Sequence, residues 1–246
     1  MSAAPIRIAM WSGPRNISTA MMRSFGARLD TFVVDEPFYA AYLSVSGVVH
    51  PMNAEVLASQ PQDWRQVAAA LLGPVPEGKA VFYQKHMTHH MLPGFGRAWM
   101  REVRNAFLIR DPAAVLASYV LKRDEVCLAD IGIVRQRELF DEVADRLGVA
   151  PPVVSCADVL ASPSSMLPKL CSALGIEFDA SMLRWPPGRR ATDGVWAPAW
   201  YDAVERSTGF DSPSPAKKAV ELPDQLRRIA DEAMPHYEVM ARVAIR

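Results

Sequence analysis

Residues 14–19 (PRNIST) have the side chains and the setting of an anion-binding loop, between the apolar run 6–11 and a segment with helical character. A strand that turns sharply into a helix points backbone N–H groups at the turn, and the helix N-terminus adds a partial positive charge. Arg15 offers a guanidinium that suits a phosphate or sulfate, and Ser18 and Thr19 offer hydroxyl donors. The segment therefore predicts a phosphate or sulfate site, and the plain alternative is a capped turn between strand and helix.

The same segment lacks the key residues of a nucleoside-triphosphate loop, G-x-x-x-x-G-K-[ST]. Counted from Gly13, the second glycine falls on Ser18, the lysine on Thr19 and the magnesium-binding hydroxyl on Ala20. A nucleoside triphosphate normally requires that lysine and a metal ion. The sequence therefore favours an anion site without triphosphate chemistry.

A second candidate anion site begins at Arg110, which follows the predicted strand 104–109. Open α/β sheets bind ligands at this carboxyl end of their strands. Asp111 is a good N-cap and Pro112 fits a first helical position, so a helix should follow, with Ser118 about two turns along it. Arg110 and Ser118 together could bind one further phosphate. Alternatively, Arg110 pairs with a carboxylate and Ser118 is a helix-surface serine.

Together, the two segments resemble the sulfotransferase superfamily, whose sulfuryl donor is 3′-phosphoadenosine 5′-phosphosulfate (PAPS). Its first motif, typically P-[RK]-S-G-T-T, is similar to residues 14–19, and its second, an arginine and a serine eight positions later, is similar to Arg110 and Ser118. Residues 153–163 (VVSCADVLASP) resemble a third pattern. The resemblance implies PAPS as co-substrate, with the 5′-phosphosulfate bound by Arg15, Asn16, Ile17, Ser18 and Thr19 and the 3′-phosphate bound by Arg110 and Ser118.

The chain also looks like a bacterial sulfotransferase-like subgroup sometimes labelled aminotransferase-like, although it has no pyridoxal-phosphate signature. It departs from the common loop at Asn16 and Ile17, which replace a Ser-Gly pair. Because Ile17 is β-branched, a positive φ would be strained there. We therefore expect the loop to be wound as the start of a helix over residues 16–29.

Sulfuryl transfer needs a group that takes the acceptor's proton, and the candidates follow two predicted strands. Glu36 follows strand 31–35, and Pro37 biases Glu36 towards an extended conformation. Many cytosolic sulfotransferases have K-x-H after the third strand; here Lys85 matches the lysine but Met87 takes the histidine position. The base therefore stays open between Glu36, which we favour, and the nearby histidines, with Lys85 as electrostatic helper. The candidate catalytic residues are Glu36, Lys85, His86 and His89, with His90 beside them.

The composition narrows the class of protein. A chain of 246 residues that is 50% hydrophobic predicts one domain, 1–246, with a sizeable core. Its 27 basic and 27 acidic residues give no charge excess for a nucleic acid or a membrane surface. Three cysteines in apolar contexts and no apolar run of membrane length favour a cytoplasmic protein. We expect a small-molecule acceptor, no metal because the histidines lack an obvious fourth ligand, and a possible homodimer.

The elements that must position these residues alternate along the chain. We predict strands at 6–11, 31–35, 80–85, 104–109 and 152–156, and helices at 16–29, 61–72, 111–123, 134–148, 163–175 and 216–243. This order predicts a P-loop NTPase-like three-layer α/β/α fold around a central, mainly parallel sheet. Residues 184–215, which are rich in tryptophan, are expected to form a lid or substrate wall. By the resemblance, Arg189 and Arg190 are candidates for the 3′-phosphate, or else two solvated arginines.

The sequence therefore predicts transfer of a sulfuryl group from PAPS to a hydroxyl or amine of a small molecule. A small-molecule kinase or NTPase and a non-catalytic nucleotide-binding module remain the alternatives.

Overall fold

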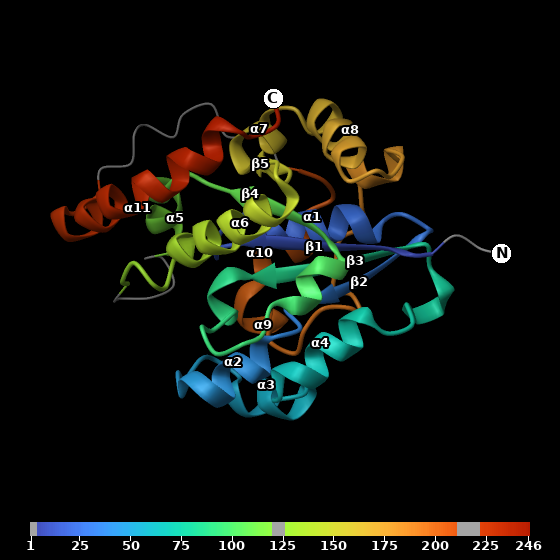
Figure 1. Ribbon diagram of the computed structural model, residues 1–246, viewed down its shortest axis with the longest axis horizontal. Coiled ribbons are helices and arrows are strands. Elements are labelled where there is room, and N and C mark those ends of the chain that lie inside the picture. Colours follow the sequence, from blue (N-terminus) through green and yellow to red (C-terminus); the bar gives the residue numbers. More distant parts are fainter. Residues whose placement is uncertain (1–3, 120–125, 211–221) are drawn as a thin grey trace.

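The central element of the fold is a five-stranded sheet. The computed structural model describes residues 4–119, 126–210 and 222–246. All strand pairs are parallel, in the order β2-β3-β1-β4-β5 (Figure 1). The predicted parallel α/β architecture is therefore confirmed. The strands are β1 (Ile6–Ser12), β2 (Thr31–Asp35), β3 (Val81–Met87), β4 (Arg104–Ile109) and β5 (Val153–Ser155).

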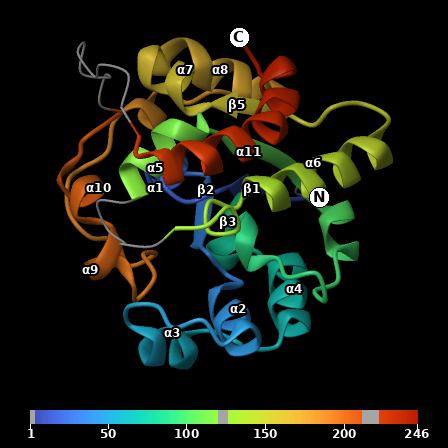
Figure 2. The ribbon, with the colours of Figure 1, turned by 90° about the vertical axis from the view of Figure 1, so that its left-hand side faces the viewer.

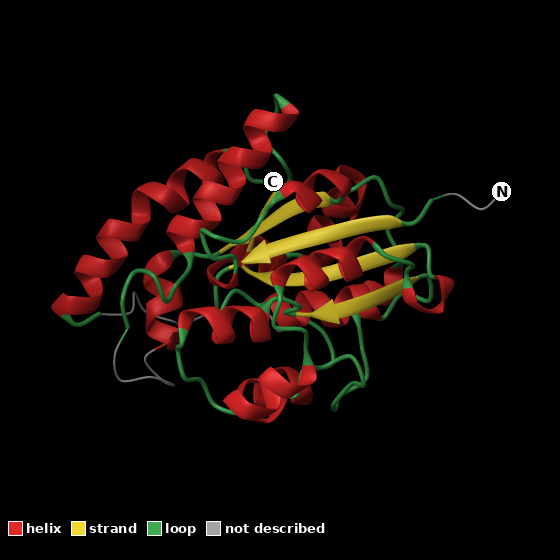
Figure 3. Cartoon of the chain, turned by 60° about the horizontal axis from the view of Figure 1, so that its bottom comes forward, coloured by secondary structure: helices red, strands yellow, loops and turns green. Residues whose placement is uncertain are grey.

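Helices cover both faces of this sheet (Figure 3). Successive side chains of a strand point to opposite faces, so Ala9 and Trp11 of β1 join one apolar cluster while Ile8 and Met10 join another. The first cluster takes side chains from α4 (Trp64–Leu72), α5 (Pro112–Tyr119), α6 (Ile133–Leu147) and α11 (Asp224–Arg242). The second takes them from α1 (Ser18–Gly26), α7 (Cys156–Ala161) and α8 (Pro163–Ala173).

A third, smaller cluster lies away from the sheet and was not predicted. It packs α2 (Tyr39–Ser46) and α3 (Asn53–Ser59) against α9 (Ala197–Trp200) and Tyr201, just before α10 (Asp202–Arg206), and Figure 2 shows α9 beside α2 and α3. Neither α2 nor α3 has a side-chain cap, and all four helices are short, so the sequence signals for these helices are weak.

Several predicted helix bounds need correction. The helix predicted at 16–29 begins at Ser18 and ends at Gly26. The helix predicted at 111–123 is described as far as Tyr119, and its last residues lie outside the described part, as do 216–221 of the last helix. β3 continues to Met87, two residues beyond the prediction, which decides where the nearby histidines point.

Candidate active site

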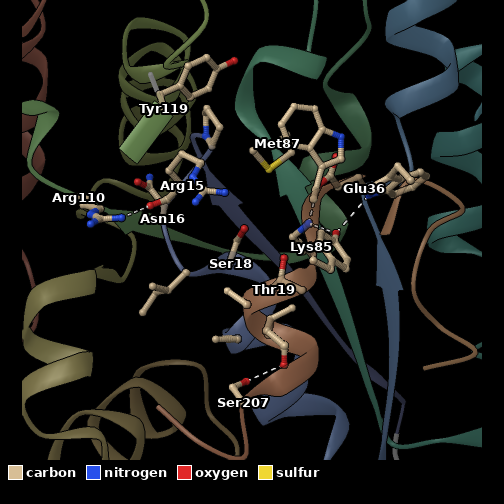
Figure 4. A pocket seen from close by; sticks show the side chains of 18 of the residues that line it. Arg15, Asn16, Ser18, Thr19, Glu36, Lys85, Met87, Arg110, Tyr119 and Ser207 are labelled. Atoms are coloured by element: carbon tan, nitrogen blue, oxygen red, sulfur yellow. Dashed lines mark hydrogen bonds and ion pairs between the residues drawn. The ribbon is translucent and has the colours of Figure 1, made fainter. Parts of the chain in front are cut away.

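A cavity of about 390 Å³ opens at the carboxyl ends of the central strands, between the start of α1 and residues 196–210 (Figure 4). Its size falls in the range of small-molecule sites. Two polar regions meet in it: the loop before α1 with Arg110 on one side, and the ends of β2 and β3 on the other. Each region corresponds to one half of the predicted site.

The loop before α1 presents backbone donors to the cavity. Arg15 (φ 61°) and Ile17 (φ 51°) both adopt the left-handed conformation, so the expectation that Ile17 would avoid it and wind into the helix is wrong. The left-handed turn at Ile17 delays α1 until Ser18, and no side chain caps the helix. The first N–H groups of a helix have no intrahelical partner, so those at Ser18 and Thr19 suit an anion.

Strained backbone is concentrated at the cavity. Of the five described non-glycine residues with positive φ, three line it: Arg15, Ile17 and Glu36. A non-glycine residue adopts the left-handed conformation only where the surrounding structure holds it there, and residues of this kind cluster at functional sites. The Arg15 carbonyl accepts a hydrogen bond from Arg110 Nη1 (2.5 Å) and the Asn16 carbonyl accepts one from Cys156 Sγ (3.0 Å), which hold the loop in place.

The guanidinium groups of Arg15 and Arg110 both lie at this loop and line the cavity. Burial and the positive charge of Arg110 lower the pKa of Arg15. Within residues 4–119, 126–210 and 222–246, no acidic side chain forms an ion pair with either arginine. Two like charges close together without an acid between them favour binding of an anion.

The other predicted donor-site residues are placed differently. Ser118 is not part of the lining; its Oγ accepts a hydrogen bond from Arg15 Nε (3.0 Å). Asn16 lines the cavity, but its side-chain amide donates to the Leu108 carbonyl (3.3 Å). Arg189 and Arg190 do not line the cavity, because Arg189 is exposed and the Arg190 guanidinium is bonded to the Pro186 carbonyl.

Four polar side chains meet at the ends of β2 and β3, three from these strand ends and one, Tyr201, from the segment between α9 and α10. Lys85 Nζ lies 2.8 Å from Asp35 Oδ1, 2.5 Å from Glu36 Oε1 and 2.8 Å from the Tyr201 hydroxyl. Burial and the charge of Asp35 raise the pKa of Glu36, against the opposing effect of Lys85. The neighbouring carboxylates raise the pKa of Lys85 despite its burial, so the lysine is charged. Glu36 is not extended as expected, because its φ is 39°.

The histidines divide between β3, which carries His86, and the short turn Thr88–His90 that follows it. Lys85 and Met87 line the cavity, so His86 points to the opposite face, where its ring stacks on Trp11 at 4.4 Å between centroids. Burial and the charge of Lys85 lower the pKa of His86 to about 3. His86 is therefore wrong as a candidate base. His89 lines the cavity, and so does His90.

His90 lies next to Glu36. Its Nδ1 is 3.9 Å from Glu36 Oε2, too far for a hydrogen bond, and this buried nitrogen has no hydrogen-bond partner among the described residues. The ring is stacked between Tyr39 (4.5 Å) and Tyr42 (4.8 Å), and burial lowers the pKa of His90, so it is neutral. The sequence placed His90 only beside the candidates, because spacing alone does not say which histidine faces inward.

Residues 184–210 form one wall of the cavity. Their ends are joined by a bridge between Arg184 and Gly209. Asp193 makes two hydrogen bonds to Arg23 of α1 (2.6 and 2.7 Å), and the Gly194 N–H donates to Asp35 (3.0 Å). A Cβ at Gly194 would lie 2.1 Å from the Trp196 ring, so only glycine fits there. These contacts hold Trp196, Trp200, Tyr201 and Phe210 against the cavity.

Known proteins that resemble this chain identify its family. A model of the sulfotransferase domain family matches residues 6–244. The chain belongs to the sulfotransferase domain family. Among solved structures, this sulfotransferase domain is similar to the sulfotransferase domain from the Synechococcus PCC 7002 olefin synthase (TM-score 0.60, 18% identity, 98% of this chain and 96% of that one). It is also similar to the sulfotransferase domain from the curacin biosynthetic pathway (TM-score 0.58, 17% identity, 95% and 99%).

Two curated relatives come from Arabidopsis thaliana. The sulfotransferase domain is 33% identical over 238 residues to branched-chain-amino-acid aminotransferase-like protein 1, and 33% identical over 235 residues to aminotransferase-like protein 2. These alignments cover 97% and 95% of the chain but only 42% and 41% of the relatives. The chain thus spans less than half the length of either relative.

The described residues of the sulfotransferase domain lack two kinds of feature. In residues 4–119, 126–210 and 222–246 there is no group of three or more His, Cys, Asp or Glu side chains that could hold a metal ion. No helix in the same ranges is long and apolar enough to cross a membrane.

Proposed function

We propose that the protein transfers a sulfuryl group from PAPS to a hydroxyl or amine of a small molecule. One observation carries the proposal: Arg15 and Arg110, without an acidic partner in the described part of the chain, share one cavity with Glu36 and with an uncapped helix N-terminus. The cavity thus joins a site for a doubly anionic ligand to a candidate proton acceptor. PAPS would supply an activated sulfuryl group there.

The donor half would use five of the residues that the sequence predicted, one of them, Ser118, in a changed role. Arg15 and the N–H and hydroxyl groups of Ser18 and Thr19 would hold the 5′-phosphosulfate, and Arg110 the 3′-phosphate. Charge-assisted hydrogen bonds of this kind are about twice as strong as neutral ones. Ser118 would act through Arg15, because its hydroxyl is bonded to Arg15 Nε.

The acceptor half would lie between Glu36 and His90. A nucleophilic oxygen or nitrogen placed beside Glu36 Oε2 and His90 Nδ1, off the line that joins them, would be within hydrogen-bond distance of both atoms, which lie 3.9 Å apart. Glu36 would take its proton, and a raised pKa suits a base that works near neutral pH. The aromatic wall of Tyr39, Trp196 and Trp200 would exclude water from this end of the cavity.

The names of the plant relatives do not transfer aminotransferase chemistry to this chain, which covers 42% and 41% of their lengths. Pyridoxal phosphate is held by a lysine free to form a Schiff base. Lys85 is the lysine of the described cavity lining, and it is charged and bonded to three acceptors. The charged and fully bonded state of Lys85 therefore favours sulfuryl transfer over Schiff-base chemistry with pyridoxal phosphate.

The first test is ligand choice, measured by thermal shift and titration calorimetry. We expect adenosine 3′,5′-bisphosphate to bind and stabilise the protein, and EDTA to leave that binding unchanged, because the loop lacks the magnesium-binding hydroxyl. Stabilisation by ATP with Mg²⁺ that EDTA abolishes, without any response to the bisphosphate, would instead favour the kinase alternative.

The second test is turnover, with labelled PAPS and a metabolite extract as the source of acceptors. Glu36→Gln keeps size and hydrogen bonding but removes the base, so it should lower turnover about a hundredfold or more while leaving bisphosphate affinity unchanged. Glu138→Gln on the exposed face of α6 is the matched control. Full activity in Glu36→Gln would contradict this role of Glu36.

A further inference from the structure

The Lys85 ammonium has no donor left for a ligand. An ammonium group carries three N–H donors. Lys85 Nζ has three acceptors at 2.8, 2.5 and 2.8 Å: Asp35 Oδ1, Glu36 Oε1 and the Tyr201 hydroxyl. Its side chain is 1% exposed, although it lines the cavity. A direct contact with a transferred group would require breaking one of these bonds.

The Tyr201 hydroxyl is saturated in the same way. It accepts from Lys85 Nζ (2.8 Å) and Trp196 Nε1 (3.2 Å), and it donates to Asp35 (2.7 Å to Oδ2). Asp35 Oδ2 also accepts from the Gly194 N–H (3.0 Å). A hydroxyl has one donor and two acceptor lone pairs, so this one is fully used. Neither Lys85 nor Tyr201 therefore has an unused donor, although both side chains line the cavity.

We infer that Lys85, held by Asp35 and Tyr201, is a positioning residue that fixes Glu36 Oε1 and leaves Glu36 Oε2 facing His90 and the cavity. This changes the expected role of Lys85, which would act on the base and not on the transferred group. The inference rests on the proposed function of Glu36 as that base. It also gives the wall segment a part in the site, because Tyr201 belongs to it.

The charged and polar groups around Glu36 determine in which direction each substitution should move the pKa of Glu36. Lys85 on β3 lowers the pKa of Glu36 by its charge and its hydrogen bond, the nearby Tyr201 hydroxyl also lowers it, and Asp35 on β2 raises it. His90, the titratable group that faces Glu36 from the other side, is neutral. The other titratable groups on this side of the cavity are Tyr39, His50 and His89.

The test follows Glu36 itself by NMR titration of protein labelled with ¹³C at the glutamate carboxyl, assigned by the signal lost in Glu36→Gln. Lys85→Met should raise the pKa of Glu36 by about 1–3 units, because an opposite charge in contact is lost. Asp35→Asn should lower it. Tyr201→Phe should raise it by less than Lys85→Met does, since the lysine charge remains.

Lys169→Met, on the exposed face of α8, is the matched control and should leave the Glu36 signal unchanged. Lys85→Met should also keep its affinity for adenosine 3′,5′-bisphosphate within about twofold. An unchanged Glu36 pKa in Lys85→Met, or a bisphosphate affinity lowered tenfold or more, would overturn the inference. If Lys85→Met does not fold, the inference is tested by Asp35→Asn, which should lower the pKa of Glu36, and by Tyr201→Phe, which should raise it. Shifts of the same sign in these two variants would overturn the inference.

None of these readouts needs an acceptor or turnover. If Glu36→Gln proves fully active while the NMR shifts have the expected signs, the proposed role of Glu36 as the base fails and the effect of Lys85 on Glu36 stands.

Discussion

The bond between Arg15 and Ser118 predicts how the two residues share their contribution to ligand binding. Arg15 Nε donates to Ser118 Oγ at 3.0 Å, and Ser118 lies outside the cavity lining. If Ser118 acts only by orienting the guanidinium, Ser118→Ala loses one neutral acceptor, worth about 0.5–1.5 kcal/mol. This corresponds to a Kd for adenosine 3′,5′-bisphosphate about 2- to 13-fold higher.

Arg15→Met removes the charge-assisted contact itself, worth about 1.5–3 kcal/mol, or roughly a 13- to 160-fold higher Kd. Once Arg15 is gone, Ser118 has nothing to orient. The double variant should therefore bind as weakly as Arg15→Met alone, with a coupling energy about equal to the whole Ser118 effect. A serine that contacts the ligand directly would instead give additive losses.

Titration calorimetry on the wild type, both single variants and the double variant measures this cycle, with circular dichroism to check that each is folded. Additive losses would refute the indirect role and restore the phosphate contact implied by the family resemblance. No loss in Arg15→Met would remove the Arg15 guanidinium from the donor site.

Three further outcomes follow from the structure. Arg110→Ala should weaken adenosine 3′,5′-bisphosphate far more than AMP in calorimetry, by about 1.5–3 kcal/mol, and equal losses would remove Arg110 from the 3′-phosphate. Asp193→Asn should cost about 3–5 kcal/mol in urea unfolding, because it leaves Arg23 charged and buried (side chains 3% and 0% exposed), whereas Asp141→Asn in an exposed pair should cost less than about 1 kcal/mol. The pKa of His86 is lowered to about 3 in the folded state, from its ordinary value of 6.5. Between these two pH values the unfolded state binds the extra proton, so the free energy of unfolding decreases as the pH falls from about 6.5 to about 3. His86→Phe should make this acid loss shallower by up to about 1.4 kcal/mol per pH unit, and an unchanged slope would contradict a buried neutral His86.

The sequence alone determined the sheet and the position of its anion loop. The strands are short apolar runs followed by turn residues and helical segments, and this order permits few arrangements besides a parallel sheet with helices on both faces. Strand ends then place Arg15, Glu36, Lys85 and Arg110 at one edge, and all four line the cavity. These are local signals, readable without knowing what packs against what.

Which histidine faces the cavity depends on the last two residues of β3. β3 was predicted to end at residue 85 and ends at Met87, so its two-residue alternation carries past Lys85 and turns His86 to the Trp11 side. His90, in the short turn after the strand, faces Glu36 instead. Propensity does not set such a boundary; it follows from the ladder that pairs β3 with β1 as far as Ser12.

Tertiary structure alone decided the rest of the site. Ile17 and Glu36 adopt positive φ values against their local preference, because Arg110 and Cys156 hold the carbonyls of the first loop and the Lys85 carbonyl accepts from the Glu36 N–H in the second. Tyr201 and Asp193 reach Lys85 and Arg23 across 116 and 170 residues of chain. No sequence period connects residues so far apart; only the packing of the wall segment brings them together, and burial then makes their pairing necessary.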